Sequence, residues 1–254
     1  MTAVTQARVV ASEWTKLHSL RSSRVTMVVA LGLVVGLGLV VAWTSVADWE
    51  PGTPTEGYNA LERSLAGIYL AQLAFGVLGA MAVTGEYATG TIRATFAAVP
   101  SRLPVLWAKL AVFLAVTLAL GTAACVLAFV GGQAIFATKD VDASFGDPGV
   151  TRSVLGAGLF LAGMGALGLA LGALLRNTAA AISTLTLVLF VVPAIVEMLP
   201  WEEAVGPYLP GSAGLSLVFA GTGPLGPWEG FGVLCGYVVV TLGVAAVLLV
   251  RRDT

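Results

Sequence analysis

The chain is poor in charge, since charged residues make up 11% and hydrophobic residues 57% of its 254 residues. Soluble domains carry roughly a quarter charged residues, and the mean hydropathy of +0.93 departs from them in the same direction. A soluble fold of this length could not bury so much apolar surface. The composition therefore predicts an integral membrane protein. The net charge of -1 gives no basic field of the kind that attracts nucleic acid.

The chain also lacks the side chains of most catalytic and metal sites. Its 1 histidine, His18, cannot build a metal site alone, and its 2 cysteines, Cys125 and Cys235, form no C-x-x-C pair. The lysines occur in WTKLH, WAKLA and ATKDV, none of which is the Gly-Lys-Ser or Gly-Lys-Thr context of a P-loop. We therefore expect no ATPase or other enzyme activity, no cofactor and no metal in this chain. Active transport would have to draw its energy from another subunit.

Long uncharged runs, in contrast, are abundant. A helix of roughly 20 apolar residues crosses the hydrocarbon core, and continuous rather than alternating apolar runs favour helices over a β-barrel. We predict an all-α integral membrane protein, a single transmembrane domain over residues 1–254. Its spans are expected at about residues 25–47, 64–85, 106–136, 153–175, 177–198 and 230–250.

The basic residues are unevenly divided between the two sides of these spans. Six spans place both termini on one side, and only Arg63, Lys139 and Arg152 fall on the opposite side. The terminal side holds the others: Arg8, Lys16, Arg21, Arg24, Arg93, Arg102, Lys109, Arg176, Arg251 and Arg252. The positive-inside rule then predicts a multi-pass protein of the cell membrane with both termini cytoplasmic. The uncharged runs themselves contain no ionisable residue, which argues against a proton-coupled transporter.

Three further patterns bear on the arrangement of the spans. Residues 6–24 place Val10, Trp14 and Leu17 on one face of a helix, which favours an interfacial amphipathic helix over a solvated one. The apolar stretch between prolines in residues 197–229 is too short to span, and we expect a re-entrant segment there rather than a disordered loop. Small-residue pairs allow close helix packing; they are Gly32–Gly36, Gly168–Gly172 and Gly232–Gly236.

Residues 85–110, GEYATGTIRATFAAVPSRLPVLWAKL, separate two spans and are unusually polar. Glu86 comes at a helix C-terminus, where the helix dipole disfavours a carboxylate, so we expect a cationic partner, with Arg93 and Arg102 near in sequence. Gly90 should break the helix. After it, Ile92, Phe96 and Val99 have the spacing of a short amphipathic helix. Pro100 should end that helix, with Lys109 near the boundary of the next span.

This arrangement resembles the cytoplasmic coupling region of type-2 ABC transporter permeases, the membrane subunits of six-helix ABC exporters. The pattern there is an acid, then Gly-Thr, then Pro-Ser-Arg, then a lysine opening the next span. The N-terminal SEWTKLHSLRSSRVT resembles that family's interfacial elbow helix, and residues 208–221 resemble its outer segment before the last span. The resemblance implies an ATPase-coupling role for the matching residues: Glu86, Gly90, Thr91, Ile92, Arg93, Phe96, Pro100, Arg102 and Lys109.

The resemblance further implies a permease domain that pairs, as a homo- or heterodimer, on two copies of a separate P-loop ATPase, which binds ATP and Mg. Export through a path between two permease chains, lined by parts of the second and fifth spans, would follow. The abundance of Gly, Ala and Val suggests a bacterial source. Two alternatives remain from the residues alone: a membrane anchor or signalling partner, which would bind no ATPase, and a secondary transporter or channel, which would act alone.

Overall fold

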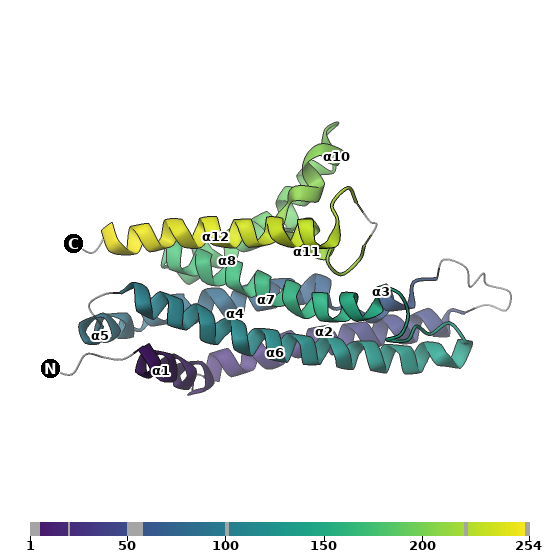
Figure 1. The fold of residues 1–254 in the computed structure, drawn as a ribbon, viewed down its shortest axis with the longest axis horizontal. Coiled ribbons are helices and arrows are strands. Elements are labelled where there is room, and N and C mark those ends of the chain that lie inside the picture. The colour runs from purple at the N-terminus through teal and green to yellow at the C-terminus, as the bar shows by residue number, and fades with distance from the viewer. Residues whose placement is uncertain (1–5, 20, 50–57, 100–101, 221–222, 252–254) are drawn as a thin grey trace.

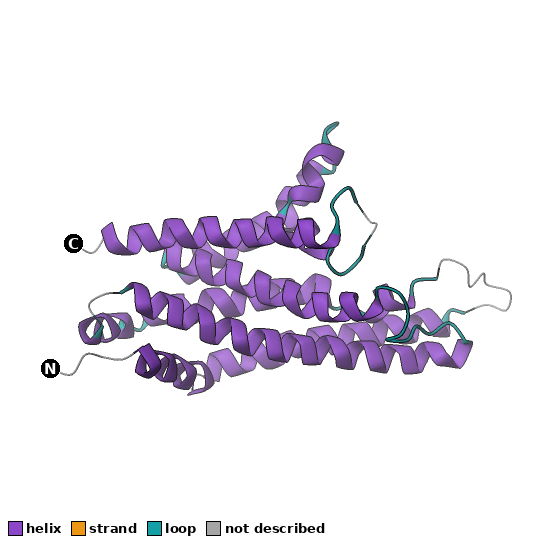
Figure 2. Cartoon of the chain, viewed as in Figure 1, coloured by secondary structure: helices purple, strands orange, loops and turns teal. Residues whose placement is uncertain are grey.

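The computed structural model describes residues 6–19, 21–49, 58–99, 102–220 and 223–251. Within these ranges the chain consists of helices and connecting loops, without a strand (Figure 2). Six helical stretches are long and apolar enough to cross a membrane: Arg24–Ala47, Ala60–Ala88, Leu103–Lys139, Val150–Leu175, Thr178–Val196 and Pro227–Arg251. The predicted all-α membrane protein with six spans is confirmed.

Several of these spans are built from more than one helical element. The first, fourth and sixth are single helices, α2 (Arg21–Ala47), α7 (Val150–Leu175) and α12 (Pro227–Arg251). The second joins α3 (Ala60–Ser64) to α4 (Ile68–Ala88), and the third joins α6 (Leu103–Phe136) to η1 (Ala137–Lys139). The fifth joins α8 (Thr178–Thr186), η2 (Leu187–Val191) and α9 (Val192–Val196). Shorter elements complete the chain: α1 (Gln6–Ser19), α5 (Thr91–Ala98), α10 (Glu202–Val205), η3 (Gly206–Tyr208) and α11 (Pro210–Leu215).

The long helices lie roughly side by side, and both chain ends lie at the same end of the bundle (Figure 1). We call this the terminal end; α1 and α5 lie there as well. We call the opposite end, where α3 and the link from α6 to α7 lie, the distal end. Helix α7 occupies the middle of the bundle, packed against α4, α6, α8 and α12.

Glycine allows α4 and α7 to approach until their backbones touch. A Cβ at Gly79 of α4 would lie 2.0 Å from the carbonyl oxygen of Gly165, and one at Gly168 of α7 would lie 1.9 Å from that of Gly76. Atoms that are not bonded to each other cannot approach so closely, so only glycine, which has no side chain, fits at these two positions. The pair Gly168–Gly172 is therefore a packing motif within the chain. At Gly32, Gly36, Gly232 and Gly236 a Cβ would meet nothing within 4 Å.

The helices continue beyond the uncharged runs that defined the predicted spans. Helix α4 extends through Glu86 to Ala88, and α6 begins at Leu103, so Lys109 lies in its second turn. The expectation that the spans contain no ionisable side chain is therefore wrong, and Glu86 and Lys109 are examples at the terminal end. Both charges are buried next to opposite charges, and this attraction offsets part of the cost of removing them from water.

The fifth span changes its helical geometry just before its proline. It is α-helical through Thr186, π-helical over Leu187–Val191 and α-helical again from Val192. Pro193 has no N–H to donate, and its ring would collide with the carbonyl four residues earlier in a regular α-helix. The wider π turn fits this local defect.

The short segment before the last span is packed into the protein. Helix α11 lies against α12 and α7, and Leu217 and Val218, which follow it, are fully buried. The chain leaves the helix here, so its carbonyls need other donors. The Arg152 guanidinium donates to the carbonyl of Leu217 at 2.6 Å, and the Ser153 hydroxyl donates to that of Val218.

The α4–α7 contact predicts a contrast between two glycines of the same helix. Replacing Gly79 with alanine should lower the free energy of unfolding by about 1–3 kcal/mol, the usual cost of overpacking, because the backbone of α7 must move away. Gly85→Ala should be neutral or stabilising, since its Cβ meets nothing within 4 Å and alanine favours helix. Thermal unfolding of both variants in detergent measures this. Equal melting temperatures would show that the two backbones are not in contact.

Candidate functional site: a buried charge cluster beside α5

The Glu86 carboxylate at the terminal end of α4 is held by two lysines from other helices. Its Oε1 lies 2.7 Å from Nζ of Lys109 in α6 and 3.1 Å from Nζ of Lys16 in α1. The expectation that Glu86 needs a cationic partner is correct, but the choice of Arg93 or Arg102 is wrong. Nearness in the sequence does not predict the partner of Glu86, because the start of α6 and helix α1 both lie beside the end of α4 in the folded chain.

Helix α1 supplies the second acid as well as the second lysine. Glu13 forms an ion pair with Lys109, and its Oε1 lies 2.6 Å from Nζ of Lys16. We call Glu13, Lys16, Glu86 and Lys109 the charge cluster. Their side chains are 2%, 32%, 8% and 9% exposed, respectively. Lys16 also donates to Oγ1 of Thr95 in α5 at 3.3 Å, so the cluster joins α1, α4, α5 and α6.

The charge cluster is electrically balanced, with two acids and two lysines. Burial by itself lowers the pKa of the Lys16 ammonium, but the hydrogen bond and charge of Glu13 and the charge of Glu86 outweigh it and raise the pKa above its ordinary value. Lys16 therefore stays protonated at physiological pH. One buried acceptor, Oε2 of Glu86, has no hydrogen-bond partner among the described residues. Each acid thus depends on the lysines, and loss of one lysine would leave buried charge uncompensated.

Helix α5 begins at a glycine and binds the bundle through its apolar face. Gly90 has φ of +72°, a left-handed conformation that glycine adopts without strain, and this confirms the predicted break. Ile92 is buried, and Phe96 packs on the terminal core that includes Val105. Val99 packs on the same core. The sequence alone does not decide whether Ile92, Phe96 and Val99 contact the ATPase or the membrane; in the structure they pack on the remainder of this chain.

The opposite face of α5 is open. Thr91, Arg93, Ala94 and Ala97 are exposed. Apart from Arg93, this face consists of small side chains, so another chain could approach the helix closely. The apolar face of α5 therefore holds it in place, and its outer face is free for a second molecule.

Two arginines bind the terminal end of α12. Nη1 of Arg102 donates to the carbonyl of Leu249 at 3.3 Å, and Nη2 of Arg176 donates to that of Leu248 at 3.5 Å. The last carbonyls of a helix have no hydrogen-bond donor within the helix, and the two arginines supply donors for two of them. The Arg102 guanidinium also lies 5.4 Å from the centre of the Phe96 ring. Arg102 thus connects α5 to the last span.

Most of the residues predicted for coupling lie together at the terminal end. Glu86 and Lys109 form one ion pair, while Gly90, Ile92 and Phe96 shape and anchor α5. Thr91 starts α5, and Pro100 lies outside the described residues. The sequence analysis missed Glu13 and the role of Lys16. A signal existed, because Glu13 is one of few acids on the terminal side and has a lysine three residues later, the spacing of a helical ion pair.

Six apolar helices with both chain ends at one end define a multi-pass membrane protein. Comparison with known families identifies its class: residues 9–193 match the sequence model of a family described as ABC-2 family transporter protein. The match extends from α1 into the fifth span and includes the whole charge cluster. The chain therefore belongs to the ABC-2 transporter family and is an ABC transporter permease, as its resemblance implied. A search of curated proteins found no match.

The charge cluster predicts that Lys109 is much more important for stability than an exposed lysine. Lys109→Met should lower the free energy of unfolding by about 3–5 kcal/mol, because it leaves Glu13 and Glu86 buried with only Lys16 as a partner. Lys139→Met, at an exposed position, is the matched control and should have little effect. Adding Glu86→Gln to Lys109→Met should recover part of the loss, since one of the buried charges is then removed. Thermal unfolding in nanodiscs measures all three, and equal values for Lys109→Met and Lys139→Met would contradict the cluster.

Proposed function

We propose that this chain is the membrane-spanning subunit of an ATP-driven ABC exporter and that α5 is the element through which a separate ATPase acts on it. The observation that carries the proposal is the attachment of α5. Its apolar face is fastened to the bundle, its outer face is open, and the charge cluster links it to α1, α4 and α6. A helix held at several points moves together with the helices that hold it, so a force applied to α5 would reach them.

The contacts of α5 define the path along which a force on this helix would reach the spans. Gly90 joins it directly to α4, Thr95 reaches the charge cluster through Lys16, and Arg102 connects it to the end of α12. A displacement of α5 by closing ATPase subunits would therefore move the terminal ends of several spans together. Glu86, Arg102 and Lys109 act in this proposal as positioning residues that keep the linkage stiff.

The orientation and the energy source belong to the same proposal. The excess of basic residues on the terminal side favours a cytoplasmic location for that end in the cell membrane. An ATPase docked on α5 would then lie in the cytoplasm, with ATP and Mg bound in its own nucleotide site. No cofactor is assigned to the permease chain.

A second permease chain completes the proposed transporter. The outer faces of α2 and α12 carry Gly32, Gly36, Gly232 and Gly236, where a Cβ would meet nothing within 4 Å in this chain. Small residues on an open helix face support close packing of a neighbouring helix. A homo- or heterodimer that packs through one of these faces would place the translocation path between two chains.

The proposal predicts that the outer face of α5 binds the ATPase. Tagged chain purified gently from its native membranes should carry a stoichiometric P-loop ATPase, identified by mass spectrometry. Arg93→Glu should reduce its recovery about tenfold or more, equivalent to about 1.4 kcal/mol, because the charge of an exposed contact is reversed. Lys139→Glu makes the same change at the distal end and should leave recovery unchanged. Absence of any ATPase in several mild detergents would favour a membrane anchor or signalling partner.

A second prediction separates binding from coupling and uses a thiol at the terminal end of α12. Arg251→Cys, at an exposed position, gives a maleimide a target outside the apolar run, whereas Cys235 lies within that run and Cys125 is buried. ATP with vanadate should change the labelling rate of this variant several-fold. When Arg102→Ala is added, which removes the hydrogen bond to Leu249, the ATPase should still bind but the change should disappear. Arg24→Ala, at an exposed position of α2, is the control and should leave the response of Arg251→Cys unaltered; a normal response with Arg102→Ala would remove Arg102 from the linkage.

A further inference from the structure

A cavity of about 610 Å³ opens among the distal elements. It is lined by residues of α4, the end of the fifth span, α10, α11 and the segment after α11. Pockets of about 300–1,000 Å³ hold small organic ligands, so this cavity has the size for one. Its lining lies at the end of the molecule opposite the charge cluster and α5 and shares no residue with them.

One wall of the cavity is aromatic and apolar. The Tyr69 and Phe219 rings are stacked, with centroids 5.9 Å apart and planes 19° apart, and both line the cavity together with Leu215. Tyr69 is 38% exposed, so part of its ring remains open to a ligand. Such a wall suits an apolar body, and an aromatic face also attracts a cation.

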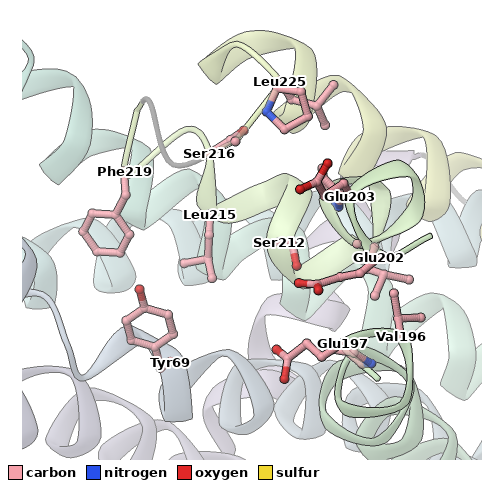
Figure 3. A pocket seen from close by; sticks show the side chains of 16 residues that line it. Tyr69, Val196, Glu197, Glu202, Glu203, Ser212, Leu215, Ser216, Phe219 and Leu225 are labelled. Carbon is pink, nitrogen blue, oxygen red and sulfur yellow. The ribbon is translucent and has the colours of Figure 1, made fainter. Parts of the chain in front are cut away.

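The facing wall is acidic. Glu197, Glu202 and Glu203 line the cavity, and no lysine, arginine or histidine of the described ranges does so. Figure 3 shows the carboxylates of Glu197 and Glu202 turned toward the side on which Tyr69 and Leu215 lie. Among the described residues none of these three acids forms an ion pair, so their charge is available to a ligand.

A buried hydrogen-bond acceptor, the side-chain oxygen of Gln72, lies beside this cavity. Gln72 follows Tyr69 by one turn of α4 and is 5% exposed, and its Oε1 has no hydrogen-bond partner among the described residues. A Cβ at Gly211 of α11 would lie 3.5 Å from that oxygen, which places it behind the α11 wall next to Ser212 of the lining. The neighbourhood thus presents acceptors and negative charge without a cationic side chain among the described lining residues.

From the stacked wall, the unpaired carboxylates and the volume, we propose that the distal cavity binds an organic cation with an apolar body. The cation lies between the carboxylates of Glu197 and Glu202 and the ring of Tyr69, and its apolar part packs on Leu215 and Phe219. Together with the proposed function, on which this role rests, the cavity is a cargo site at the outer end of the permease.

Two ions of nearly the same shape and opposite charge test the site. Tetraphenylphosphonium should bind saturably to the full chain in nanodiscs, measured by equilibrium dialysis after subtraction of empty nanodiscs, and tetraphenylborate should not. The double variant Glu197→Gln/Glu202→Gln should bind tetraphenylphosphonium about tenfold or more weakly. The control Asp140→Asn/Asp142→Asn removes the same charge at exposed distal positions and should bind like wild type. Raising the ionic strength should weaken binding to wild type more than to the glutamate variant.

Each other result overturns the proposal. Absence of saturable tetraphenylphosphonium binding to wild type, equal binding of tetraphenylborate, or equal losses in the two double variants would each show that the cavity is not a cation site. The glutamates are exposed, so their replacement leaves the fold intact. Binding to the chain without the ATPase is independent of the pull-down experiment, so failure of the cation site and failure of the exporter proposal are distinguishable.

Discussion

The terminal end of the molecule depends on one physical constraint, the need to balance charge where water is scarce. Glu86 and Lys109 lie inside long apolar helices, and each alone would be costly there. Glu13 and Lys16 add a second neutral pair from α1, and their ion pairs with Lys109 and Glu86 hold the N-terminal helix against α6 and α4. The position of α5 follows, because it starts one short turn after Glu86 and its Thr95 meets the same lysine.

The middle of the bundle follows a different rule, the close approach of two backbones. Gly76 and Gly79 of α4 face Gly165 and Gly168 of α7, and the surfaces fit because no side chain stands between them. Contact of this kind gains dispersion energy over many atoms and leaves little freedom to slide. The charge cluster therefore rests on a helix pair that behaves as one body.

Local features were predictable from the sequence, and features that depend on distant contacts were not. Gly90 and the spacing of Ile92 and Phe96 define α5 through the conformation of a few neighbouring residues, and the structure has that helix. The predicted partner of Glu86 was wrong, because Lys109 and Lys16 reach its carboxylate from other helices. The distal cavity had no sequence signal, since Tyr69 and Glu197 come from different spans and converge only in the folded chain.

Helix α4 connects the two regions to which we assign function. Tyr69 at its distal start lines the cavity, and Glu86 at its terminal end belongs to the charge cluster. At 1.5 Å per residue the two positions are about 25 Å apart along the helix, which is most of a hydrocarbon core. Because α4 packs against α7, we expect the two helices to move as one rigid unit. A tilt of α4 caused by movement of Glu86 would then also move Tyr69. In the proposed exporter, a change at α5 would then alter the distance between Tyr69 and the glutamates on the opposite wall, and cargo affinity would depend on the state of the ATPase.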